Sequence, residues 1–478
     1  MDHSVCMSIR NRSATNTAKA TMLSRFLLIL LFAQSGLLLG SEPAKVRNVL
    51  LIVSDDLKAS VLGCYGDPLC KTPNIDELAA RSMVFDKTYC QGLMCGPSRQ
   101  SFMFSRYVGA SGSGPSMAEH FKNNGWYTAR VGKIYHMRVP GDIIAGTNGN
   151  DHAASWTQRF NAPGREAHTP GRYSLLNQNI VTTNEENRQS TGDPHRPFVT
   201  VESDGDGTDQ PDYKAATKAI ELMRVHRDDP FFLAVGFVRP HYPMVAPPSY
   251  FAPYPIDKIT APKTLPGDHD DIPKAGLAQS TSQKIGIDKY PDNVKRMWAG
   301  YYAAVTFMDE QVGRVLGELD RLGLQDNTAV VFTSDHGYHL GEHEFWQKSN
   351  VHEEVTRVPL IVCAPGRKPG RAVTFAELVD IYPTVSELAG LSTPTDIVGQ
   401  SLIRALDDPN AMVRDTAYSG GGKQRSLRND QWSYMNYGSN GEELYDMRND
   451  PRQFTNLAND ARYADVLDGF RDRLSKIQ

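Results

Sequence analysis

Residues 95–99, Cys-Gly-Pro-Ser-Arg, place a thiol near a cation in a setting that favours anions. A proline that can occupy the first turn of a helix follows Cys95, so this cysteine is predicted to lie at a helix N-terminus. Free backbone N–H groups and the helix dipole favour negative charge there, and Arg99 adds a permanent cation with a planar fork of donors. An anion site is therefore expected around Cys95, the alternative being a buried apolar cysteine in an ordinary loop.

Acidic residues follow two apolar runs of strand length. Asp55 and Asp56 come after the first run, and Asp335 and His336 come after the second. Adjacent carboxylates at the end of a buried strand repel one another unless a cation lies between them. Three carboxylates beside an anionic ligand favour a hard divalent cation, Ca²⁺ or Mg²⁺, over Zn²⁺, which prefers nitrogen and sulfur.

Two more apolar runs end in groups that carry charge or protons. Lys133 and His136 follow residues 127–131, and His241 follows residues 231–238. A lysine and a histidine three residues apart can converge on one point, one as a fixed charge and the other as a titratable group. Taken singly, each is more often an ordinary surface residue.

The elements that must position these groups are predicted to be strands of a parallel sheet. Continuous apolar runs are typical of strands buried on both faces. The carboxyl ends of such strands share one rim, where open α/β sheets bind ligands. We therefore expect the following residues to gather beside the helix of Cys95: Asp55, Asp56, Lys133, His136, His241, Asp335 and His336.

The other segments are predicted to be scaffold. Thr72 is expected to cap a short helix, and the longest amphipathic pattern runs over residues 292–322. Residues 137–215 are polar and aperiodic, as insertions over the sheet edge would be. The Pro-rich residues 242–255 are expected to be irregular and to form a wall of the cleft. Residues 204–209 are acidic but lack the spacing of an EF-hand, so we expect a solvated turn.

Composition and length describe a globular, exported chain. The 478 residues are 40% hydrophobic and 22% charged, and the net charge of −4 predicts no nucleic-acid partner. Residues 1–44 are predicted to hold a secretory signal peptide and a preceding segment, the alternative being an uncleaved membrane anchor. Residues 45–405 are then a catalytic domain, and residues 406–478, with short strands between Gly, Asn and Asp turns, a small antiparallel α+β subdomain.

The motifs carry a family resemblance. Cys95-Gly96-Pro97-Ser98-Arg99 resembles the Cys-x-Pro-Ser-Arg pattern by which type I sulfatases mark the cysteine that is oxidised to formylglycine. Other family motifs are matched, in their usual order, by Asp55-Asp56, Gly132-Lys133, His241 and Asp335-His336-Gly337. The resemblance covers about residues 46 to 390, and several segments, including 132–136 and 340–343, are most similar to the iduronate 2-sulfatase branch.

The resemblance implies a fold and a cofactor. The fold would be an alkaline-phosphatase-like α/β sandwich, with a large, mixed, mostly parallel sheet flanked by helices and the small C-terminal subdomain. One Ca²⁺ per chain would be held by Asp55, Asp56, the oxidised Cys95, Asp335 and His336.

The resemblance also implies an activity, hydrolysis of the 2-O-sulfate of iduronate or a related uronate during glycosaminoglycan degradation. Hydrated formylglycine would attack sulfur, and charge would be neutralised by Arg99, Lys133 and Lys348. His136 would accept a proton from the second hydroxyl, and His241 would protonate the leaving oxygen. A formylglycine-generating or equivalent maturation enzyme is an implied partner.

Other functions remain open. The substrate could be another sulfated polysaccharide, the enzyme a phosphatase or phosphonate hydrolase, or the protein a sulfated-glycan binder with an unmodified Cys95. Tyr338, His339 and residues 137–215 depart from the family pattern and are expected to line the substrate pocket, and Gln453 stands where the family usually has Glu.

Location and disulfide content are less constrained. No Asn-x-Ser/Thr site follows the predicted signal, so a bacterial periplasmic or extracellular location is favoured over a lysosomal one. With Cys95 modified, four cysteines would follow the signal and could form two disulfides, one or none. No stable membrane insertion is expected once the signal is removed.

Overall fold

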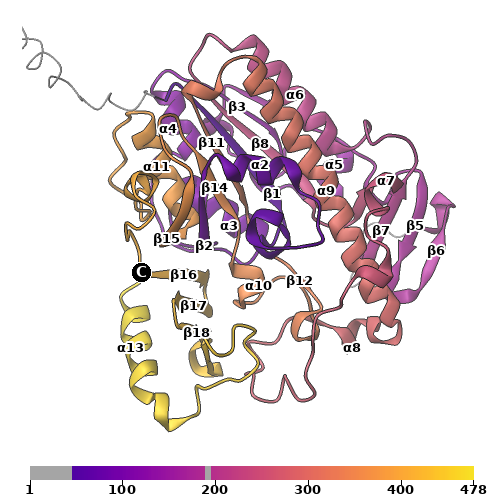
Figure 1. The fold of residues 1–478 in the computed structure, drawn as a ribbon. Coiled ribbons are helices and arrows are strands. Elements are labelled where there is room, and N and C mark those ends of the chain that lie inside the picture. The colour runs from indigo at the N-terminus through magenta and orange to yellow at the C-terminus, as the bar shows by residue number, and fades with distance from the viewer. Residues whose placement is uncertain (1–45, 189–194, 478) are drawn as a thin grey trace, which may run out of the picture. The chain divides into compact units, whose positions relative to one another are not determined.

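The computed structural model describes residues 46–188 and 195–477, and an eight-stranded sheet lies at its centre (Figure 1). Every neighbouring pair in the sheet is parallel except the two pairs that β14 makes, so the sheet is mixed and mostly parallel, as predicted. The strands, in spatial order, are β15 (Gly370–Glu377), β2 (Met83–Tyr89), β14 (Leu360–Cys363), β11 (Thr328–Ser334), β1 (Asn48–Asp55), β8 (Phe231–Pro240), β3 (Tyr127–Gly132) and β4 (Gln158–Phe160).

The four strands predicted from apolar runs are neighbours, in the order β11, β1, β8 and β3. Their registers are aligned, since Ser54 pairs with Ser334 and Gly132 pairs with Gly236. All four run in the same direction, and their carboxyl ends therefore share one rim of the sheet. The sequence-based placement of the candidate residues on that rim is confirmed by this topology.

Helices cover both faces of the sheet, because the apolar strands expose side chains alternately to each face. On β1, Leu50 and Ile52 pack toward one helical layer, whereas Val49, Leu51 and Val53 pack toward the other. The first layer contains α2 (Pro73–Ala80), α6 (Pro211–Val225) and α9 (Pro291–Arg321). The second contains α3 (Cys95–Phe104), α4 (Met117–Asn123), α11 (Ile381–Leu388) and α12 (Ile403–Asp407).

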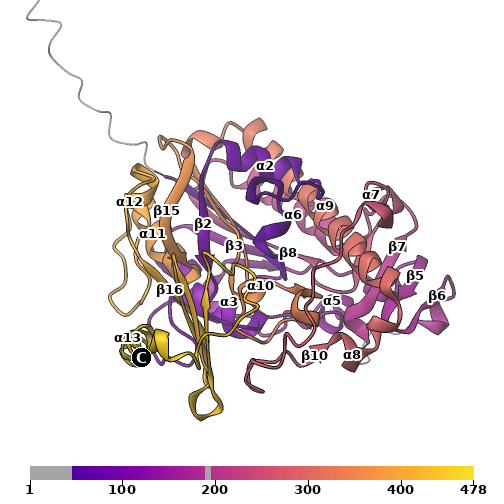
Figure 2. The same cartoon turned by 60° about the horizontal axis from the view of Figure 1, so that its bottom comes forward.

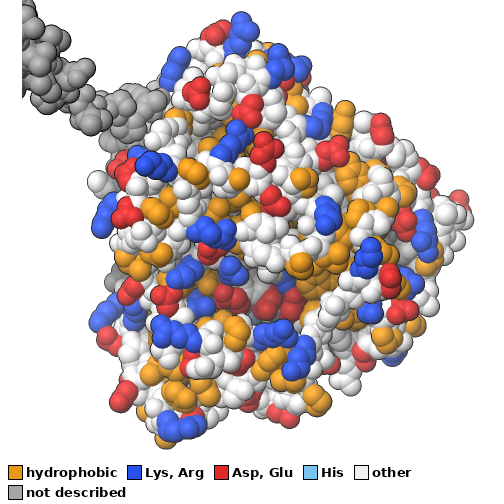
Figure 3. Space-filling view, viewed as in Figure 1, with side chains coloured by type: hydrophobic (Ala, Val, Ile, Leu, Met, Phe, Trp, Pro, Cys, Tyr) orange, Lys and Arg blue, Asp and Glu red, His pale blue; other side chains and the backbone are white. Residues whose placement is uncertain are grey.

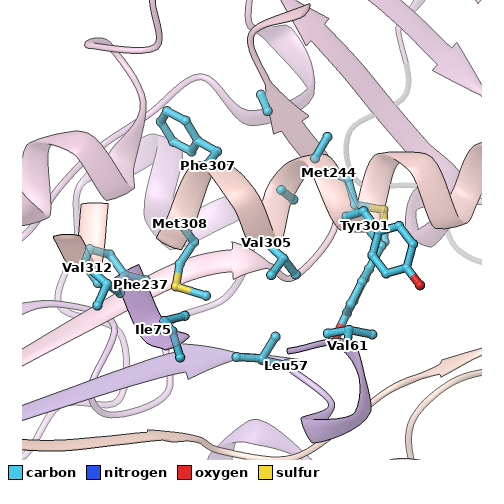
Figure 4. Close-up of a cluster of buried hydrophobic side chains, with 14 of the residues drawn as sticks. Leu57, Val61, Ile75, Phe237, Met244, Tyr301, Val305, Phe307, Met308 and Val312 are labelled. Atoms are coloured by element: carbon cyan, nitrogen blue, oxygen red, sulfur yellow. The ribbon is translucent and has the colours of Figure 1, made fainter. Parts of the chain in front are cut away.

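Helix α9 supplies much of the first layer and agrees closely with the predicted amphipathic helix. Figure 4 shows Val305 and Met308 of α9 pointing toward Leu57 and Ile75. Leu57 follows β1, and Ile75 lies in α2. All four side chains are fully buried. Burial of an aliphatic side chain of this size stabilises the fold by roughly 1.5–3 kcal/mol, so this contact fixes the chain just beyond Asp55 and Asp56.

Thr72 is the N-cap residue of α2, as predicted, but its side chain does not cap the helix. The Thr72 hydroxyl makes no capping hydrogen bond and instead donates to Asp76 Oδ1 at 3.1 Å. Asp309 of α9 takes the capping role, because its Oδ1 accepts from the Ile75 N–H at 2.8 Å and its Oδ2 accepts from the Asn74 N–H at 3.2 Å. A carboxylate at a helix N-terminus satisfies N–H groups that have no partner within the helix.

The loop-rich region contains a second sheet that the sequence analysis did not predict. Its strands, in spatial order, are β6 (Ile180–Thr182), β5 (Gly171–Leu175), β7 (Val199–Ser203) and β9 (Met244–Ala246). Residues 242–255 were expected to be irregular, but they contain β9 and α7 (Pro248–Phe251). That prediction is therefore partly wrong. The strand can form because Pro243 and Pro247 flank β9 and do not interrupt it. Helix α5 (Gly141–Ala145) lies in the same predicted insertion.

A small antiparallel sheet carries the segment that leads to Lys348. It consists of β10 (Ser280–Thr281), β13 (Phe345–Gln347) and β12 (His339–Leu340), with α8 (Ser282–Ile285) after β10. Lys348 follows β13 directly, and α10 (Glu353–Thr356) comes next. Both Figure 1 and Figure 2 place α3 and α10 between β16 on one side and α8 on the other.

The C-terminal region is an antiparallel four-stranded sheet with one helix, as predicted. Its strands, in spatial and chain order, are β16 (Thr416–Gly421), β17 (Gln424–Asn429), β18 (Trp432–Asn436) and β19 (Glu442–Asp446), and α13 (Ala464–Ser475) follows. The domain boundary at residue 405 stays a prediction. The predicted signal peptide lies outside the described residues.

The surface carries mixed charges and the described cysteines are unpaired. Figure 3 shows Lys and Arg side chains interspersed with Asp and Glu over the face in view, in keeping with the small net charge. The five cysteines of the described chain are free thiols. Within residues 46–188 and 195–477, no helix combines the length and the apolar character that crossing a bilayer requires.

Candidate active site

Cys95 is the first residue of α3, where the sequence placed it, and its side chain is surrounded by ionisable groups. Its Sγ lies 3.2 Å from Lys348 Nζ, 3.4 Å from His336 Nε2 and 3.3 Å from Asp55 Oδ1. Lys133 Nζ is slightly farther, at 3.8 Å. Burial and Asp55 raise the pKa of the thiol, but the two lysines outweigh them and leave its pKa below the ordinary value.

Asp55 ends β1 and is fully buried. Lys133 Nζ donates to its Oδ2, and Arg99 Nη2 lies 3.3 Å from its Oδ1. Burial alone raises the pKa of this carboxyl group. Lys133 and the other nearby basic side chains nevertheless hold the pKa well below its usual range, so Asp55 is ionised.

Asp56 has an unusual backbone conformation, with a φ of 64° in the left-handed region. Lys348 Nζ donates to its Oδ1 at 2.5 Å, and Tyr301 donates its hydroxyl proton to the Asp56 carbonyl oxygen, also at 2.5 Å. Its Oδ2 is buried without a hydrogen-bond partner among the described residues. Burial raises the pKa of Asp56 to about 7, although Lys348 and His336 lower it.

Arg99 and Asp335 link α3 to the end of β11. Arg99 Nε donates to Asp335 Oδ2 at 2.9 Å, and Arg99 Nη1 donates to the carbonyl oxygens of Lys133 and Ile134. Asp335 Oδ1 also accepts from the backbone N–H of Asp56 at 3.2 Å. Arg99 and Asp335 are both fully buried. Their hydrogen bonds hold the ends of β1, β3 and β11 against one another.

His336 completes a compact group of metal-ligand atoms. One atom from each of Asp55, Cys95, Asp335 and His336 lies within 4.8 Å of the others, and Asp56, Cys95 and His241 form a second group of the same kind. Burial lowers the pKa of His336, but Asp335 and Cys95 raise it to about 9. Three of these six residues, Asp55, Asp56 and Asp335, offer carboxylate oxygens, which suit a hard divalent cation.

The two predicted proton-transfer histidines, His136 and His241, line the same cavity as Cys95. His241 is buried, its Nδ1 donates to the Tyr242 carbonyl oxygen at 2.6 Å, and its Nε2 lies 3.7 Å from Asp56 Oδ2. Burial holds the pKa of His241 well below its ordinary value. Burial and Lys133 lower the pKa of the half-buried His136 to about 4.

A cavity of about 640 Å³ opens in front of Cys95. Lys133, His136, His241 and Lys348 all line it, so these predicted residues converge on one space. It also reaches residues 138–141 of the polar insertion, as the sequence analysis expected.

Tyr338 and His339 were expected to line the substrate pocket, and that expectation is wrong. Both are buried away from the described cavity lining. Tyr338 stacks on Tyr301 with ring centroids 6.1 Å apart, whereas His339 Nε2 lies 3.0 Å from Asn350 Oδ1. Their departure from the family pattern therefore concerns packing behind the cavity.

Three supporting residues were missed by the sequence analysis. The Ser334 hydroxyl donates to the His336 carbonyl oxygen at 2.9 Å and accepts from the Leu57 N–H at 2.9 Å. Arg138 and Arg196 line the cavity but follow no apolar run, so no strand-end signal singled them out.

The arrangement can bind and polarise an anion. Arg99, Lys133 and Lys348 surround Cys95 together with three carboxylates and a histidine that form a candidate cation site. An anion entering the cavity meets fixed charges in a buried setting, where electrostatic interactions are stronger than in water.

Comparisons with known proteins agree with this arrangement. Residues 47–391 match the sulfatase family model, and residues 341–478 match the model of the N-sulphoglucosamine sulphohydrolase C-terminal region. Iduronate 2-sulfatase of Mus musculus is 33% identical over 412 residues, which cover 74% of this chain and 71% of that protein.

Solved structures share the fold at lower identity. Phosphonate monoester hydrolase of Agrobacterium radiobacter superimposes with a TM-score of 0.75 at 21% identity, covering 91% of this chain and 95% of that one. A structure described as a 2-O GAG sulfatase superimposes with a TM-score of 0.65 at 21% identity, covering 91% of each chain. Both likenesses support the alkaline-phosphatase-like sandwich predicted from the motifs.

Proposed function

The chain belongs to the sulfatase family, and from that premise we propose that it removes sulfate from a sulfated carbohydrate, with the 2-O-sulfate of iduronate or a related uronate as the preferred ester. The observation that carries the proposal is the position of Cys95 at the start of α3, with two lysines and three carboxylates around it. The choice of sugar rests on the 33% identity to a relative named iduronate 2-sulfatase.

The proposed nucleophile is Cys95 converted to formylglycine by a formylglycine-generating or equivalent maturation enzyme. The hydrated aldehyde would supply an oxygen nucleophile where Sγ now lies. The low pKa of the thiol supports this assignment, since the same lysines would favour a negatively charged oxygen at that position.

A calcium ion fits the residues around Cys95. Asp56 Oδ2 is buried and lacks a hydrogen-bond partner in the described part of the chain, which is costly unless a ligand satisfies it. The proposed ligands are Asp55, Asp56, the oxidised Cys95, Asp335 and His336. When bound, the ion would supply positive charge against the sulfate oxygens.

The basic side chains are proposed to hold the sulfate group. Lys133 and Lys348 approach Cys95 Sγ from the cavity lining, and Arg99 is fixed behind them by Asp335. As charge moves from the nucleophile to the leaving oxygen, these fixed cations stabilise it without rearrangement.

The two histidines are proposed to move protons. A pKa of about 4 keeps His136 neutral at pH 5 and above, so it can accept a proton at the nucleophile. The Nδ1–H of His241 donates to the Tyr242 carbonyl oxygen, which leaves Nε2, 3.7 Å from Asp56 Oδ2, as the nitrogen that can exchange a proton. An anionic substrate would favour protonation of Nε2, as a donor to the leaving oxygen requires.

The test is a comparison of ester classes. We expect sulfate release from a 2-O-sulfated uronate disaccharide to exceed hydrolysis of 4-nitrophenyl phosphate and of a phenylphosphonate monoester in kcat/KM. Cys95→Ala should abolish sulfate release, whereas Cys363→Ala, at a half-buried thiol on β14, should not. Faster cleavage of the phosphorus esters, or binding of the disaccharide without hydrolysis, would overturn the proposal.

Location and domain organisation are part of the proposal. The chain would be exported to a bacterial periplasm or cell exterior, where polymeric sulfated saccharides are accessible. Residues 45–405 would carry the reaction, and residues 406–478 would support it.

A further inference from the structure

Lys348 is held by a smaller framework than the other two cations beside Cys95. Lys133 follows β3, a strand of the central sheet, and Arg99 lies in α3, where Asp335 accepts from its Nε at 2.9 Å. Lys348 instead follows β13, a three-residue strand of a three-stranded sheet. A lysine carries its charge on a flexible four-carbon stem, so the position of Lys348 Nζ depends on how its backbone is held.

The backbone on both sides of Lys348 adopts a conformation that favours glycine. Gln347 has a φ of 71° and Ser349 a φ of 90°, both in the left-handed region. Such conformations are unfavourable for residues with a side chain and persist where the surrounding structure holds them. The contacts of this segment therefore decide where the Lys348 side chain begins.

His339 of β12 contacts the chain both before and after Lys348. Its backbone pairs with Gln347 in the antiparallel ladder of β12 and β13. Its ring Nε2 lies 3.0 Å from Oδ1 of Asn350. One residue thus connects the position immediately before Lys348 with the position two residues after it.

The hydrogen bond between His339 and Asn350 is fully buried and runs in one direction. An amide oxygen only accepts, so His339 Nε2 carries a proton and donates it. Burial, together with His352, holds the pKa of His339 well below its ordinary value, so the ring is neutral and carries no second proton. His339 Nδ1 and Asn350 Nδ2 have no hydrogen-bond partner among the described residues. This one bond therefore orients both side chains, and its loss would leave a buried acceptor unsatisfied.

The charge that this segment carries must be placed closely. Lys348 Nζ donates to Asp56 Oδ1 at 2.5 Å and lies 3.2 Å from Cys95 Sγ. Hydrogen bonds weaken steeply as their geometry departs from the optimum, so a displacement of roughly 1 Å at a reacting centre can be costly. A fixed backbone at Gln347 and Asn350 keeps the ammonium group within this range.

We propose that His339 is a positioning residue for Lys348: it fixes the chain on both sides of that lysine and so keeps Nζ beside Cys95, where the anion binds. The inference rests on the proposed function for the role of Lys348 in holding a sulfate group. It gives His339, which departs from the family pattern, a role that requires no contact with the substrate.

Equilibrium binding of 4-nitrophenyl sulfate to the Cys95→Ala protein, with Ca²⁺ present, tests the inference separately from catalysis. We expect His339→Leu to weaken binding about fivefold. His339→Gln, whose amide can still donate to Asn350, should recover part of that loss. His120→Leu is the matched control, because it alters a buried histidine of α4 that packs beside Tyr382, and it should leave the affinity unchanged.

A double-mutant cycle separates positioning of Lys348 from general loosening of the fold. Lys348→Ala should weaken binding about tenfold or more, as loss of a hydrogen bond to a charged group does. Adding His339→Leu to Lys348→Ala should change the affinity by less than about twofold, because the side chain that His339 positions is gone. If His339→Leu does not fold, Asn350→Ala removes the same hydrogen bond and takes its place in the cycle.

An equal loss from His339→Leu with and without the Lys348 side chain, an equal loss from His120→Leu, or no loss at all would overturn the inference. Its failure can be distinguished from failure of the proposed function. If the unsubstituted protein hydrolyses no sulfate ester but the cycle still shows coupling between His339 and Lys348, the positioning role holds and the hydrolase assignment is wrong.

Discussion

The carboxylate of Asp56 combines three features that are each unfavourable without a ligand. It is buried, one of its oxygens has no hydrogen-bond partner in the described structure, and its backbone is in the left-handed region. A non-glycine residue in a sparsely populated backbone region costs on the order of 1–3 kcal/mol and is usually maintained at functional sites. A bound cation would explain why the chain retains this arrangement.

Calcium is therefore expected to stabilise the folded protein. After treatment with EGTA, addition of Ca²⁺ should raise Tm. At a Ca²⁺ concentration 100-fold above Kd, the free energy of unfolding should increase by about 2.7 kcal/mol. Asp335→Asn should remove most of that gain because it replaces a negatively charged proposed ligand with a neutral amide. Thermal melts over a Ca²⁺ titration provide the measurement.

Asp206→Asn is the matched control, because this exposed carboxylate lies in the acidic turn that lacks EF-hand spacing. It should leave the calcium response unchanged. Equal responses of the two variants, or stabilisation by Zn²⁺ but not by Ca²⁺, would contradict the assignment of the ion.

Many individual residues of the candidate site were predictable because they follow the ends of strands. Asp55, Asp335 and Lys133 follow apolar runs, and the rule that parallel strands share one rim brought them together. Arg138 and Arg196 were not predictable in the same way. They come from irregular segments, and their approach to the cavity depends on the folding of the polar insertion.

Among the elements, α2 depends on a residue that is distant in sequence. Asp309 of α9 caps the N-terminus of α2 across 234 positions, with 2.8 Å between its Oδ1 and the Ile75 nitrogen. Helix α2 packs behind the segment that carries Asp55 and Asp56, so this cap supports the rim. Thr72, the local candidate, hydrogen-bonds to Asp76 instead.

Loss of the cap should destabilise the protein. Asp309→Ala leaves the buried Ile75 N–H and the part-buried Asn74 N–H without their acceptor and should lower the free energy of unfolding by about 1–3 kcal/mol. Asp309→Asn keeps one acceptor oxygen and should cost less. Urea unfolding at pH 7 measures both, and an unchanged free energy for the alanine variant would show that α2 does not need the cap.

The same carboxylate predicts a pH dependence. Burial raises the pKa of Asp309 to about 6, whereas in the unfolded chain this carboxyl group should have its ordinary pKa of 3.8. The folded state then binds the proton more tightly, so this group adds stability as pH falls from 7 toward 4. The unsubstituted protein should gain up to about 3 kcal/mol relative to Asp309→Asn over that range, and a constant difference would contradict the shift.

Pairing direction and short strands were the least predictable elements. The direction of β14 is antiparallel to both of its neighbours, β11 and β2, and depends on contacts with strands that are distant in sequence. β9 has three residues and lies between prolines, so local sequence disfavours it. It forms because β7 pairs with it over residues 200–202.

At the scale of the whole molecule, the C-terminal sheet contacts the segment that follows Lys348. His352 Nε2 lies 3.2 Å from Glu443 Oε2, and both residues are fully buried. Gln453 Oε1 accepts from the Glu353 N–H at 3.1 Å and its Nε2 donates to the Ser433 hydroxyl at 3.0 Å. A glutamate at position 453 would lack that donor, which gives the departure from the family pattern a structural reason.

These contacts predict that residues 46–477 unfold together. Glu443→Ala leaves a buried histidine unpaired and should cost about 3–5 kcal/mol, shifting the whole calorimetric transition to lower temperature. Asp465→Ala, at an exposed position in α13, should shift it little. A second transition that moves alone in the Glu443 variant would show instead that residues 406–478 unfold independently.

The proposed reaction depends on the chemical state of residue 95. The most direct test is the mass of the peptide containing Cys95, measured on active protein produced in a host that has a formylglycine-generating enzyme, together with the rate of sulfate release from the 2-O-sulfated uronate disaccharide. The peptide is predicted to be lighter than the cysteine form by the thiol-to-aldehyde difference, and activity is predicted to rise in proportion to the converted fraction. Full activity in protein whose residue 95 is an unmodified thiol would contradict formylglycine as the nucleophile.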